Sequence, residues 1–337
     1  MHRLFAARLA LVCLLPVLPL AAQPFHFPTA NHSLLEKGAE EKFFVGTAGK
    51  PWTSGTFGCV RSDGRQIHEG LDIRCQRRDK KGEPVDPILA TADGTVAYVS
   101  SNPSLSNYGK YIVLRHQVEG LEICSLYAHL SSIQAGLKPG QTVKAGEPVG
   151  IMGRTSNTRE RISQERAHVH FELDLFINEQ FPDWFKKSRP GERNDHGVWN
   201  GQNLVGLDPR LILLAQHAQG AKFSLVEFIR GQTELCRVLV REKNLSWAGR
   251  FPALLRRNPV TEKEGVAGYE ISLNYNAVAF QLTPRAASEI KGAGRFQLLA
   301  VNAAEQEKNP GRHLVARAGQ NWTLTSRGRD ALELLAR

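Results

Sequence analysis

Short apolar runs separated by turn residues fill the region from residue 88 to residue 153. Within these runs, apolar and polar positions alternate with the period of two that is typical of strands with one buried face. Between residues 136 and 153, Gly or Pro recurs every few positions, a spacing too broken for a helix. The pattern predicts antiparallel strands and hairpins in the runs ILATADGTVAYVS (88–100), KYIVLRH (110–116) and EICSLYAHL (122–130).

A second group of apolar runs follows residue 209. RLILLAQHA (210–218) predicts a brief helix that closes a first domain, and GRDALELLAR (328–337) predicts a helix in the last turns. The fold class we expect is therefore mainly β: an antiparallel core with a second, smaller β-rich C-terminal domain. Its strands are predicted at FSLVEFI (223–229), CRVLV (236–240), YEISLNY (269–275), AVAFQL (277–282), FQLLAV (296–301) and HLVARA (313–318).

One charged segment interrupts the strand pattern. Asn157 is followed three residues later by Glu160, which resembles a capping box. It predicts a short helix over TRERISQERA (158–167) that leads the chain to His168.

The first 22 residues differ from the rest. Two arginines precede an apolar run from Leu9 to Leu20, and Ala21-Ala22 follow it, which predicts a cleavable signal peptide. A membrane anchor is the competing interpretation, but the run is shorter than the roughly 20 residues that cross a bilayer. Since no later run is long enough either, we expect an exported protein of the periplasm, cell envelope or extracellular space, with no stable membrane span after cleavage.

A length of 337 residues favours two domains. We divide the chain into a signal peptide (1–22), a lead-in segment (23–50), a first domain that carries the chemistry (51–215) and a basic β-rich C-terminal domain of unknown role (216–337).

The net charge of +10 is unevenly distributed, because residues 23–215 carry +1 and residues 216–337 carry +7. An anionic cell-wall polymer is one partner that this basic third could bind through its four large aromatic residues. A solvated basic face around an ordinary core is the alternative, and we favour it. No nucleic-acid-binding motif and no GxSxG nucleophile elbow occurs. Their absence argues against a dedicated nucleic-acid-binding protein and against a serine hydrolase. The four aromatic residues are Trp247, Tyr269, Tyr275 and Trp322.

Four cysteines remain after the leader: Cys59, Cys75, Cys124 and Cys236. Export permits disulfides, and a bond between Cys59 and Cys75 is favoured because they are close in sequence and flank a turn. Buried free thiols are the alternative.

The first candidate for chemistry is the pair His68 and Asp72 in HEGLDIRC. Gly70 between them allows the chain to bend, so that an imidazole and a carboxylate can converge on one cation. Nitrogen and oxygen donors together suit Zn²⁺. Alone, a His and an Asp four residues apart are a weak signal.

The second candidate is AHVHFEL (167–173). A period of two points His168, His170 and Glu172 to one face and three apolar residues to the other. Two neighbouring imidazoles can chelate a metal or act as an acid/base pair, and the spacing does not choose between them as ligands. Glu172 either orients one histidine or is a solvated strand residue.

A third candidate is His129 in SLYAHL, where the alternation places it on one strand face with Ser125 and Tyr127. A lone strand histidine is more often structural. His116 looks peripheral, and His196 looks like a loop residue.

Together these segments resemble the LytM/lysostaphin-type zinc metallopeptidases, family M23. The pattern of that family is His-x-x-x-Asp, then Tyr-Ala-His-Leu, then His-x-His, and all three occur here in that order. The similarity runs from about Pro51 to about Phe176 and includes GTVAYVS, NYGKYIVLRH and GQTVKAGEPVGIMG.

The resemblance implies roles for five residues. His68, Asp72 and His170 would bind one Zn²⁺ per chain, and His129 and His168 would be the catalytic residues beside it. Three protein ligands leave one position for water, whose pKa zinc lowers toward about 7. One of the two catalytic histidines would take a proton from that water, while the pair stabilises the oxyanion.

The function that the resemblance implies is zinc-dependent cleavage of peptide bonds in bacterial peptidoglycan, in stem peptides or cross-links. The alternatives are a non-catalytic LytM-type regulator of other cell-wall hydrolases and an exported metallopeptidase that acts on proteins. One departure concerns the substrate: the family commonly has a short Gly/Ser loop before His-x-His, whereas Arg154 to Arg166 is long and charged here.

Overall fold

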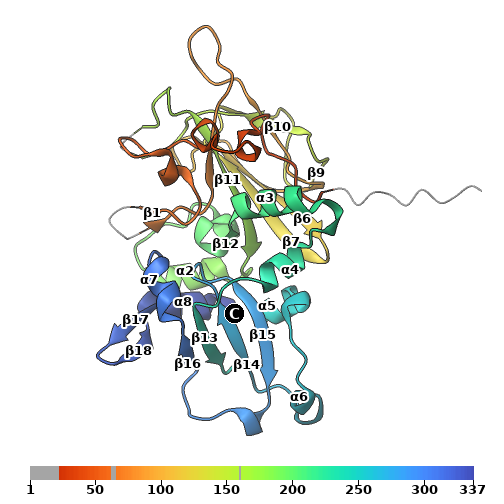
Figure 1. Ribbon diagram of the computed structural model, residues 1–337, viewed down its shortest axis with the longest axis vertical. Helices are drawn as coiled ribbons and strands as arrows, with labels where there is room; N and C mark the ends of the chain where they lie inside the picture. The colour runs from red at the N-terminus through yellow and green to blue at the C-terminus, as the bar shows by residue number, and fades with distance from the viewer. Residues whose placement is uncertain (1–22, 62–65, 159–160) are drawn as a thin grey trace, which may run out of the picture.

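The computed structural model describes residues 23–61, 66–158 and 161–337. The predicted signal peptide at 1–22 lies outside these residues. Figure 1 shows two sheet-based parts stacked along the long axis, an N-terminal part and a C-terminal part. Within the part of the chain that is described, no helix has the length and apolar character that crossing a membrane requires.

An antiparallel sheet of seven strands forms the centre of the N-terminal part. Its strands follow the order β12-β11-β7-β6-β5-β9, and β3 pairs with β11 as well. The long strands coincide with the predicted runs, so the expected mainly β fold is confirmed. The members are β3 (Leu71–Arg74), β5 (Gly94–Ser100), β6 (Tyr111–Val118), β7 (Leu121–Ala128), β9 (Thr142–Val143), β11 (His168–Phe176) and β12 (Leu204–Leu207).

Strand β11 is the central element, because it has neighbours on both edges and all nine of its residues are buried. On one edge it pairs with β7. On the other edge, β3 pairs with its first half and β12 with its second half. The sheet therefore brings together segments that are about 100 residues apart in sequence.

Smaller elements surround this sheet. A three-stranded sheet has the order β4-β10-β8, and β1 and β2 form a separate hairpin. The lead-in segment is not a free tail, since Phe43 and Phe44 are fully buried in the core. The elements are η1 (Ser33–Leu35), α1 (Glu40–Phe43), η2 (Trp52–Gly55), β1 (Val60–Arg61), β2 (Gln66–Ile67), β4 (Pro87–Leu89), β8 (Ser132–Ile133), β10 (Pro148–Ile151), α2 (Phe181–Ser188), η4 (Gly197–Trp199) and η5 (Gly201–Asn203).

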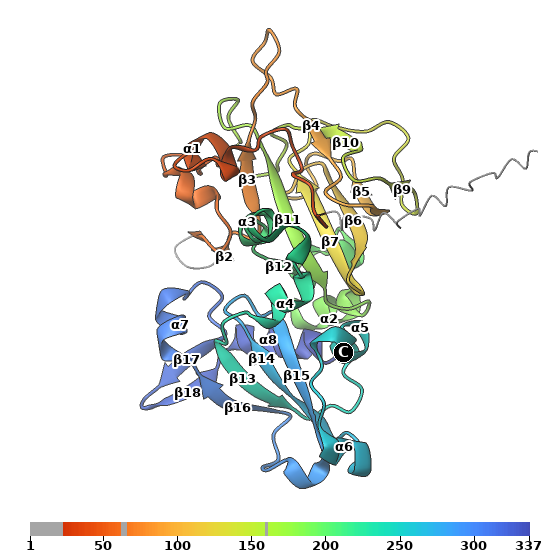
Figure 2. The ribbon, with the colours of Figure 1, turned by 45° about the vertical axis from the view of Figure 1, so that its right-hand side comes forward.

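The C-terminal part has its own antiparallel sheet in the order β15-β14-β13-β16 and a separate hairpin of β17 and β18. Helices α2 and α4 lie between the two large sheets (Figure 2). The elements are α3 (Pro209–Gln219), η6 (Gly220–Lys222), α4 (Leu225–Arg230), β13 (Cys236–Val240), α5 (Ser246–Arg250), η7 (Pro252–Leu254), α6 (Pro259–Glu264), β14 (Gly268–Leu273), β15 (Ala279–Arg285), η8 (Ala287–Glu289), β16 (Phe296–Val301), α7 (Ala303–Lys308), β17 (Val315–Ala318), β18 (Asn321–Leu324) and α8 (Ser326–Leu335).

The prediction of a strand at 223–229 is wrong, because this segment contains helix α4. Ser224 is the N-cap, and its side chain accepts a hydrogen bond from the backbone N–H of Glu227. The carboxylate of Glu119, from the hairpin between β6 and β7, accepts from the N–H groups of Leu225 and Val226. A side chain about 100 residues away in sequence thus accepts the free N–H groups of the first helical turn. The local sequence pattern at 223–229 does not reveal this contact.

The prediction of a helix over 158–167 is also wrong for the residues that are described, since 161–167 are irregular, with a single turn near Glu165. The carbonyls of Gln164 and Glu165 accept hydrogen bonds from the guanidinium of Arg78. These carbonyls are therefore bonded to a side chain of another loop and not to backbone N–H groups of a helix. The segment runs irregularly along the loop that carries Arg78.

The favoured disulfide is not formed: Cys59, Cys75, Cys124 and Cys236 are all free thiols. Cys59 is partly exposed and pairs through its backbone with His68, before β3 begins. Cys75 is buried beyond the far end of β3. The strand separates the two cysteines by roughly 13 Å along its axis, which is too far for a bond.

Candidate metal centre

The register of the sheet assembles the centre of the site. Asp72 of β3 lies directly opposite His170 of β11, and Ala128 at the end of β7 lies opposite His170 on the other edge. His68 precedes β3 by three residues and turns back toward this row. Gly70 permits the turn, because a Cβ there would collide with the carbonyl of Phe171.

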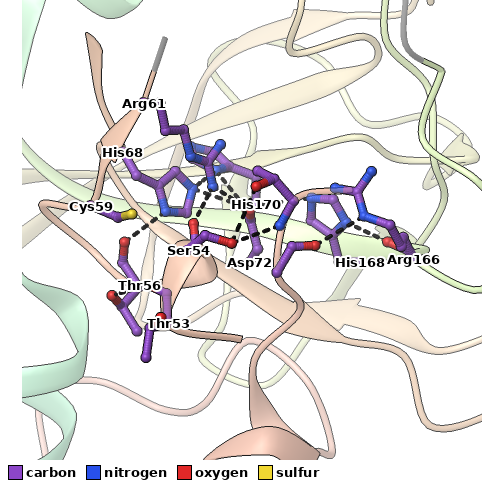
Figure 3. A network of polar contacts seen from close by, with 12 residues as sticks. Thr53, Ser54, Thr56, Cys59, Arg61, His68, Asp72, Arg166, His168 and His170 are labelled. Atoms are coloured by element: carbon purple, nitrogen blue, oxygen red, sulfur yellow. Dashed lines mark hydrogen bonds and ion pairs between the residues drawn. The ribbon is translucent and has the colours of Figure 1, made fainter. Parts of the chain in front are cut away.

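Three side-chain atoms converge at this point (Figure 3). The Nε2 of His68 lies 2.9 Å from Asp72 Oδ1 and 2.9 Å from His170 Nδ1, and the last two atoms are 3.0 Å apart. All three residues are buried. Within the described residues this is the cluster of His, Cys, Asp and Glu side chains that could hold a metal ion.

The donor set fits zinc. Two imidazole nitrogens and one carboxylate oxygen are ordinary zinc ligands, with bonds of about 2.0–2.2 Å. Tetrahedral coordination at that length separates the ligand atoms by roughly 3.4 Å. The three atoms would have to move apart by only a few tenths of an ångström, which rotation of the side chains provides.

A second layer of contacts fixes the orientation of these side chains. His68 Nδ1 donates to the carbonyl of Thr56 at 2.9 Å, which leaves Nε2 free to be a ligand. Arg61 donates to Asp72 Oδ2 at 2.8 Å, so that Oδ1 is the oxygen turned toward the histidines. His170 Nε2 contacts Glu172 Oε1 at 2.6 Å. Each ligand is therefore held by its second polar atom.

Glu172 orients His170 and is not a solvated strand residue, because only 1% of its surface is exposed. The Tyr108 hydroxyl donates to the same carboxylate at 2.8 Å. Sequence reasoning assigned no role to Tyr108. The signal was present in the phrase NYGKYIVLRH, but period-two reasoning assigns no role to a turn residue.

The charges of the cluster are coupled. Burial raises the pKa of Asp72, but the facing imidazoles of His68 and His168 outweigh it and hold that pKa well below its usual range. Burial lowers the pKa of His170, but its hydrogen bonds to Asp72 and Glu172 prevail and raise the pKa to about 10. Burial lowers the pKa of His68. The carboxylates are thus ionised and ready for a cation.

His129 and His168 lie beside the cluster, with their ring centroids 4.9 Å apart. His129 Nδ1 donates to the carbonyl of Thr155 at 2.9 Å, and His168 Nδ1 donates to the carbonyl of Arg166 at 2.6 Å. In a neutral imidazole this leaves Nε2 as the acceptor. His168 Nε2 lies 3.4 Å from Asp72 Oδ1.

The prediction that His129 continues the face of Ser125 and Tyr127 is wrong. Ser125 and Tyr127 share a hydrogen bond and are buried in the interior. Strand β7 ends at Ala128, and His129 has a left-handed backbone with φ of 63°. This turn of the backbone leaves the alternation of the strand and directs the imidazole to the cavity.

A cavity of about 1080 Å³ opens over the five predicted residues. Ser156, Thr158, Ile162 and Arg166 line it, so the segment from Arg154 to Arg166 does border the site. Thr47 and Lys50 of the lead-in segment line another side. The shape of this cavity thus depends on segments outside the ligand strands.

Two other histidines lie elsewhere. His116 is buried between the carbonyl of Asp93 and the hydroxyl of Ser125. His196 precedes η4 in a loop and contacts the hydroxyl of Tyr98 at 3.0 Å. Neither lines the cavity, as the sequence predicts.

Comparison with curated proteins finds relatives that match about a third of the chain. An uncharacterized metalloprotease of Haemophilus influenzae is 36% identical over 108 residues, which are 32% of this chain and 18% of that protein. The cell division protein DipM of Caulobacter vibrioides is 32% identical over 32% of this chain and 14% of its own length. The murein hydrolase activator NlpD of Escherichia coli is 33% identical over 32% of this chain and 22% of its own length. The match spans less than a quarter of each of these relatives.

Solved structures match about two fifths of the chain. The catalytic domain of the M23 protein EnpA from Enterococcus faecalis is 26% identical, over 39% of this chain and 87% of that one, with a TM-score of 0.25. A zinc-containing peptidase from Vibrio cholerae is 23% identical, over 40% of this chain and 37% of that one, with a TM-score of 0.24. The family model described as Peptidase family M23 matches residues 66–182. This part of the chain, which contains the three converging ligands and both neighbouring histidines, is a peptidase domain of family M23.

Proposed function

We propose that this protein is a zinc-dependent endopeptidase that hydrolyses peptide bonds in the stem peptides or cross-links of bacterial peptidoglycan. One observation carries the proposal: three converging candidate metal ligands share one cavity with two histidines whose Nδ1 atoms are held by backbone carbonyls. That combination supplies a metal site, an acid/base pair and room for a peptide.

The ligands divide the work between them. His68, Asp72 and His170 would hold the ion, and Glu172 and Arg61 keep His170 and Asp72 in place. When bound, zinc lowers the pKa of a water molecule and polarises the scissile carbonyl. The buried contacts keep the three ligand atoms within a few tenths of an ångström of the positions that zinc requires.

His129 and His168 are the proposed catalytic residues. Burial and the neighbouring His168 and His170 lower the pKa of His129 well below its usual range, so its imidazole is neutral at pH 7. A neutral His129 with Nδ1–H on a carbonyl can accept the proton of the attacking water at Nε2. The same Nε2–H can then donate to the oxyanion or to the leaving amine.

Peptidoglycan is the proposed substrate because the leader predicts export to the compartment of the cell wall, and because relatives such as DipM and NlpD are named for cell division and murein hydrolase activation. The name of NlpD also favours a second candidate, a regulator that activates other wall hydrolases. The complete ligand set argues for the enzyme, since a regulator needs no metal.

Incubation of the zinc-loaded protein with purified peptidoglycan tests the proposal, with mass spectrometry of the released muropeptides. We expect new amino termini with the wild type and none with His170→Ala or after chelation. The control is Arg329→Gln, an exposed position of α8 outside the cavity. One zinc per chain without release from any type of wall would exclude wall hydrolysis, and cleavage of Gly-rich proteins in the same assay would assign the activity to protein substrates.

A further inference from the structure

One residue of the C-terminal part lines the cavity of the metal centre. Arg312 follows α7 and lies more than 240 positions beyond His68, yet both face the same 1080 Å³ space. It lies outside the matched range 66–182. The M23 domain therefore does not contain the whole wall of its own cavity.

A chain of buried contacts positions Arg312. Its Nε donates to Asn276 Oδ1 at 2.7 Å, and Asn276 Nδ2 donates to the carbonyl of Gly206 at 2.7 Å. Asn276 is fully buried. Gly206 belongs to β12 and lies opposite Asp174 of β11, the strand that carries His170. The guanidinium is thus anchored to the same sheet as the metal ligands.

A glycine beside Arg312 allows the close approach. A Cβ at Gly311 would collide with the side chain of Ile67, the residue before His68. On the neighbouring turn, a Cβ at Gly58 would lie 3.0 Å from the hydroxyl of Tyr275. Two glycines therefore allow the C-terminal part to pack closely against β2 and against the turn that precedes β1.

The charge of the cavity favours an anion. Among the described residues that line it, four cationic side chains face two carboxylates, Glu69 and Asp72, and a bound zinc ion would add two further positive charges. Arg61 is already paired with Asp72, and the charge of Arg312 opposes the rise that burial causes in the pKa of Glu69. The surplus attracts a negatively charged ligand. The four cations are Lys50, Arg61, Arg166 and Arg312.

We infer that Arg312 binds a free carboxylate of the peptide substrate and that the C-terminal part forms one wall of the substrate site. The inference rests on the proposed function. A guanidinium held at Nε still presents its two terminal nitrogens, and a carboxylate binds such a pair in a bidentate manner. Stem peptides of peptidoglycan carry carboxylates close to their cleavable bonds, so recognition of this kind selects acidic wall peptides over neutral ones.

The experiment compares a cross-linked stem-peptide dimer that has free carboxylates with the same dimer after amidation. Binding is measured by isothermal titration to the full chain carrying His129→Asn, and cleavage is measured with the zinc-loaded protein. For the wild-type position 312 we expect at least tenfold preference for the carboxylate form in binding and in KM. Arg312→Gln should remove the preference, Arg312→Lys should keep part of it, and Arg329→Gln should keep all of it.

The outcomes separate the inference from the proposed function. A preference that depends on Arg312 without cleavage supports the carboxylate site and contradicts the peptidase. Cleavage with equal use of both dimers contradicts the carboxylate site and leaves the peptidase standing. If Arg312→Gln weakens both dimers equally while thermal unfolding shifts, Arg312 only anchors the C-terminal part, and the inference is wrong.

Discussion

Asp72 and His170 are partners across one antiparallel ladder, and Asp72 Oδ1 lies 3.0 Å from His170 Nδ1. Two ligands of the candidate centre are therefore fixed by backbone register rather than by loops. A slip of one residue between β3 and β11 would turn one of them to the opposite face. The position of the ligands is thus as stable as the pairing of the two strands.

The first prediction concerns zinc affinity and pH. Burial opposes protonation of His170, but its bonds to Asp72 and Glu172 raise its pKa to about 10, so metal-free His170 carries a proton at neutral pH. Zinc must displace that proton from Nδ1. The apparent affinity should rise about tenfold per pH unit between pH 6 and 8. Competition with a chromophoric chelator, corrected for its own protonation, measures this, and a flat profile would contradict the coupling.

The second prediction concerns Gly70→Ala. The new Cβ would meet the carbonyl of Phe171 and lie 2.9 Å from Glu172 Cγ, so the turn between His68 and β3 must shift. We expect a loss of about 1–3 kcal/mol in unfolding free energy and weaker zinc binding. Urea denaturation and zinc titration test both effects. The matched control is Gly249→Ala, where a Cβ meets nothing within 4 Å and helix α5 should keep or gain stability.

The third prediction separates metal binding from catalysis. Asn tolerates the left-handed backbone of position 129, so His129→Asn should fold normally. We expect zinc affinity within twofold of the wild type and kcat lower by about 10²–10⁴-fold, since the acid/base group is lost. The control is His217→Asn on the exposed side of α3. Full activity of His129→Asn would assign the base to another residue.

The fourth prediction concerns Asp208, the N-cap of α3, whose pKa is raised by burial to about 6. Because this lies above the ordinary 3.8, the stability that the group contributes is full below about pH 4 and is lost as pH rises through 6. Asp208→Asn keeps the cap and does not titrate. At pH 7 it should be more stable than the wild type by up to about 2 kcal/mol.

Urea denaturation of the metal-free, chelator-treated protein at several pH values between 4 and 7 measures the difference in unfolding free energy between Asp208→Asn and the wild type. The control is Asp183→Asn on the exposed side of α2. The gain of Asp208→Asn should shrink toward zero at pH 4. A gain that is the same at every pH would show that the titration of Asp208 is not its cause.

Much of the site could be predicted from the sequence because its information is local. In β11 the alternation places Val169, Phe171 and Leu173 in the core and the two histidines toward the cavity. Gly109 and Gly120 mark the turns between β5, β6 and β7, the consecutive strands that lead to His129.

The rest depends on contacts between distant segments. Helix α4 starts where Glu119 accepts its N–H groups, and the carbonyls of Gln164 and Glu165 are taken by Arg78. Tyr108 acquires a role only when the sheet places Glu172 beside it. Arg312 reaches the cavity only through the packing of the C-terminal part. Local periodicity contains none of these relationships.

The lead-in segment has a consequence for proteolytic maturation. Gln216 of α3 holds both the N–H and the carbonyl of Phe25, and Val45 donates its N–H to the carbonyl of Asp72. Phe25 and Phe44 are core residues. Removal of residues 23–45 by a processing protease would strip strand β3 of an edge contact and take both aromatic rings out of the core. We therefore expect this segment to be an integral part of the fold, whose loss would destabilise the candidate site rather than switch it on.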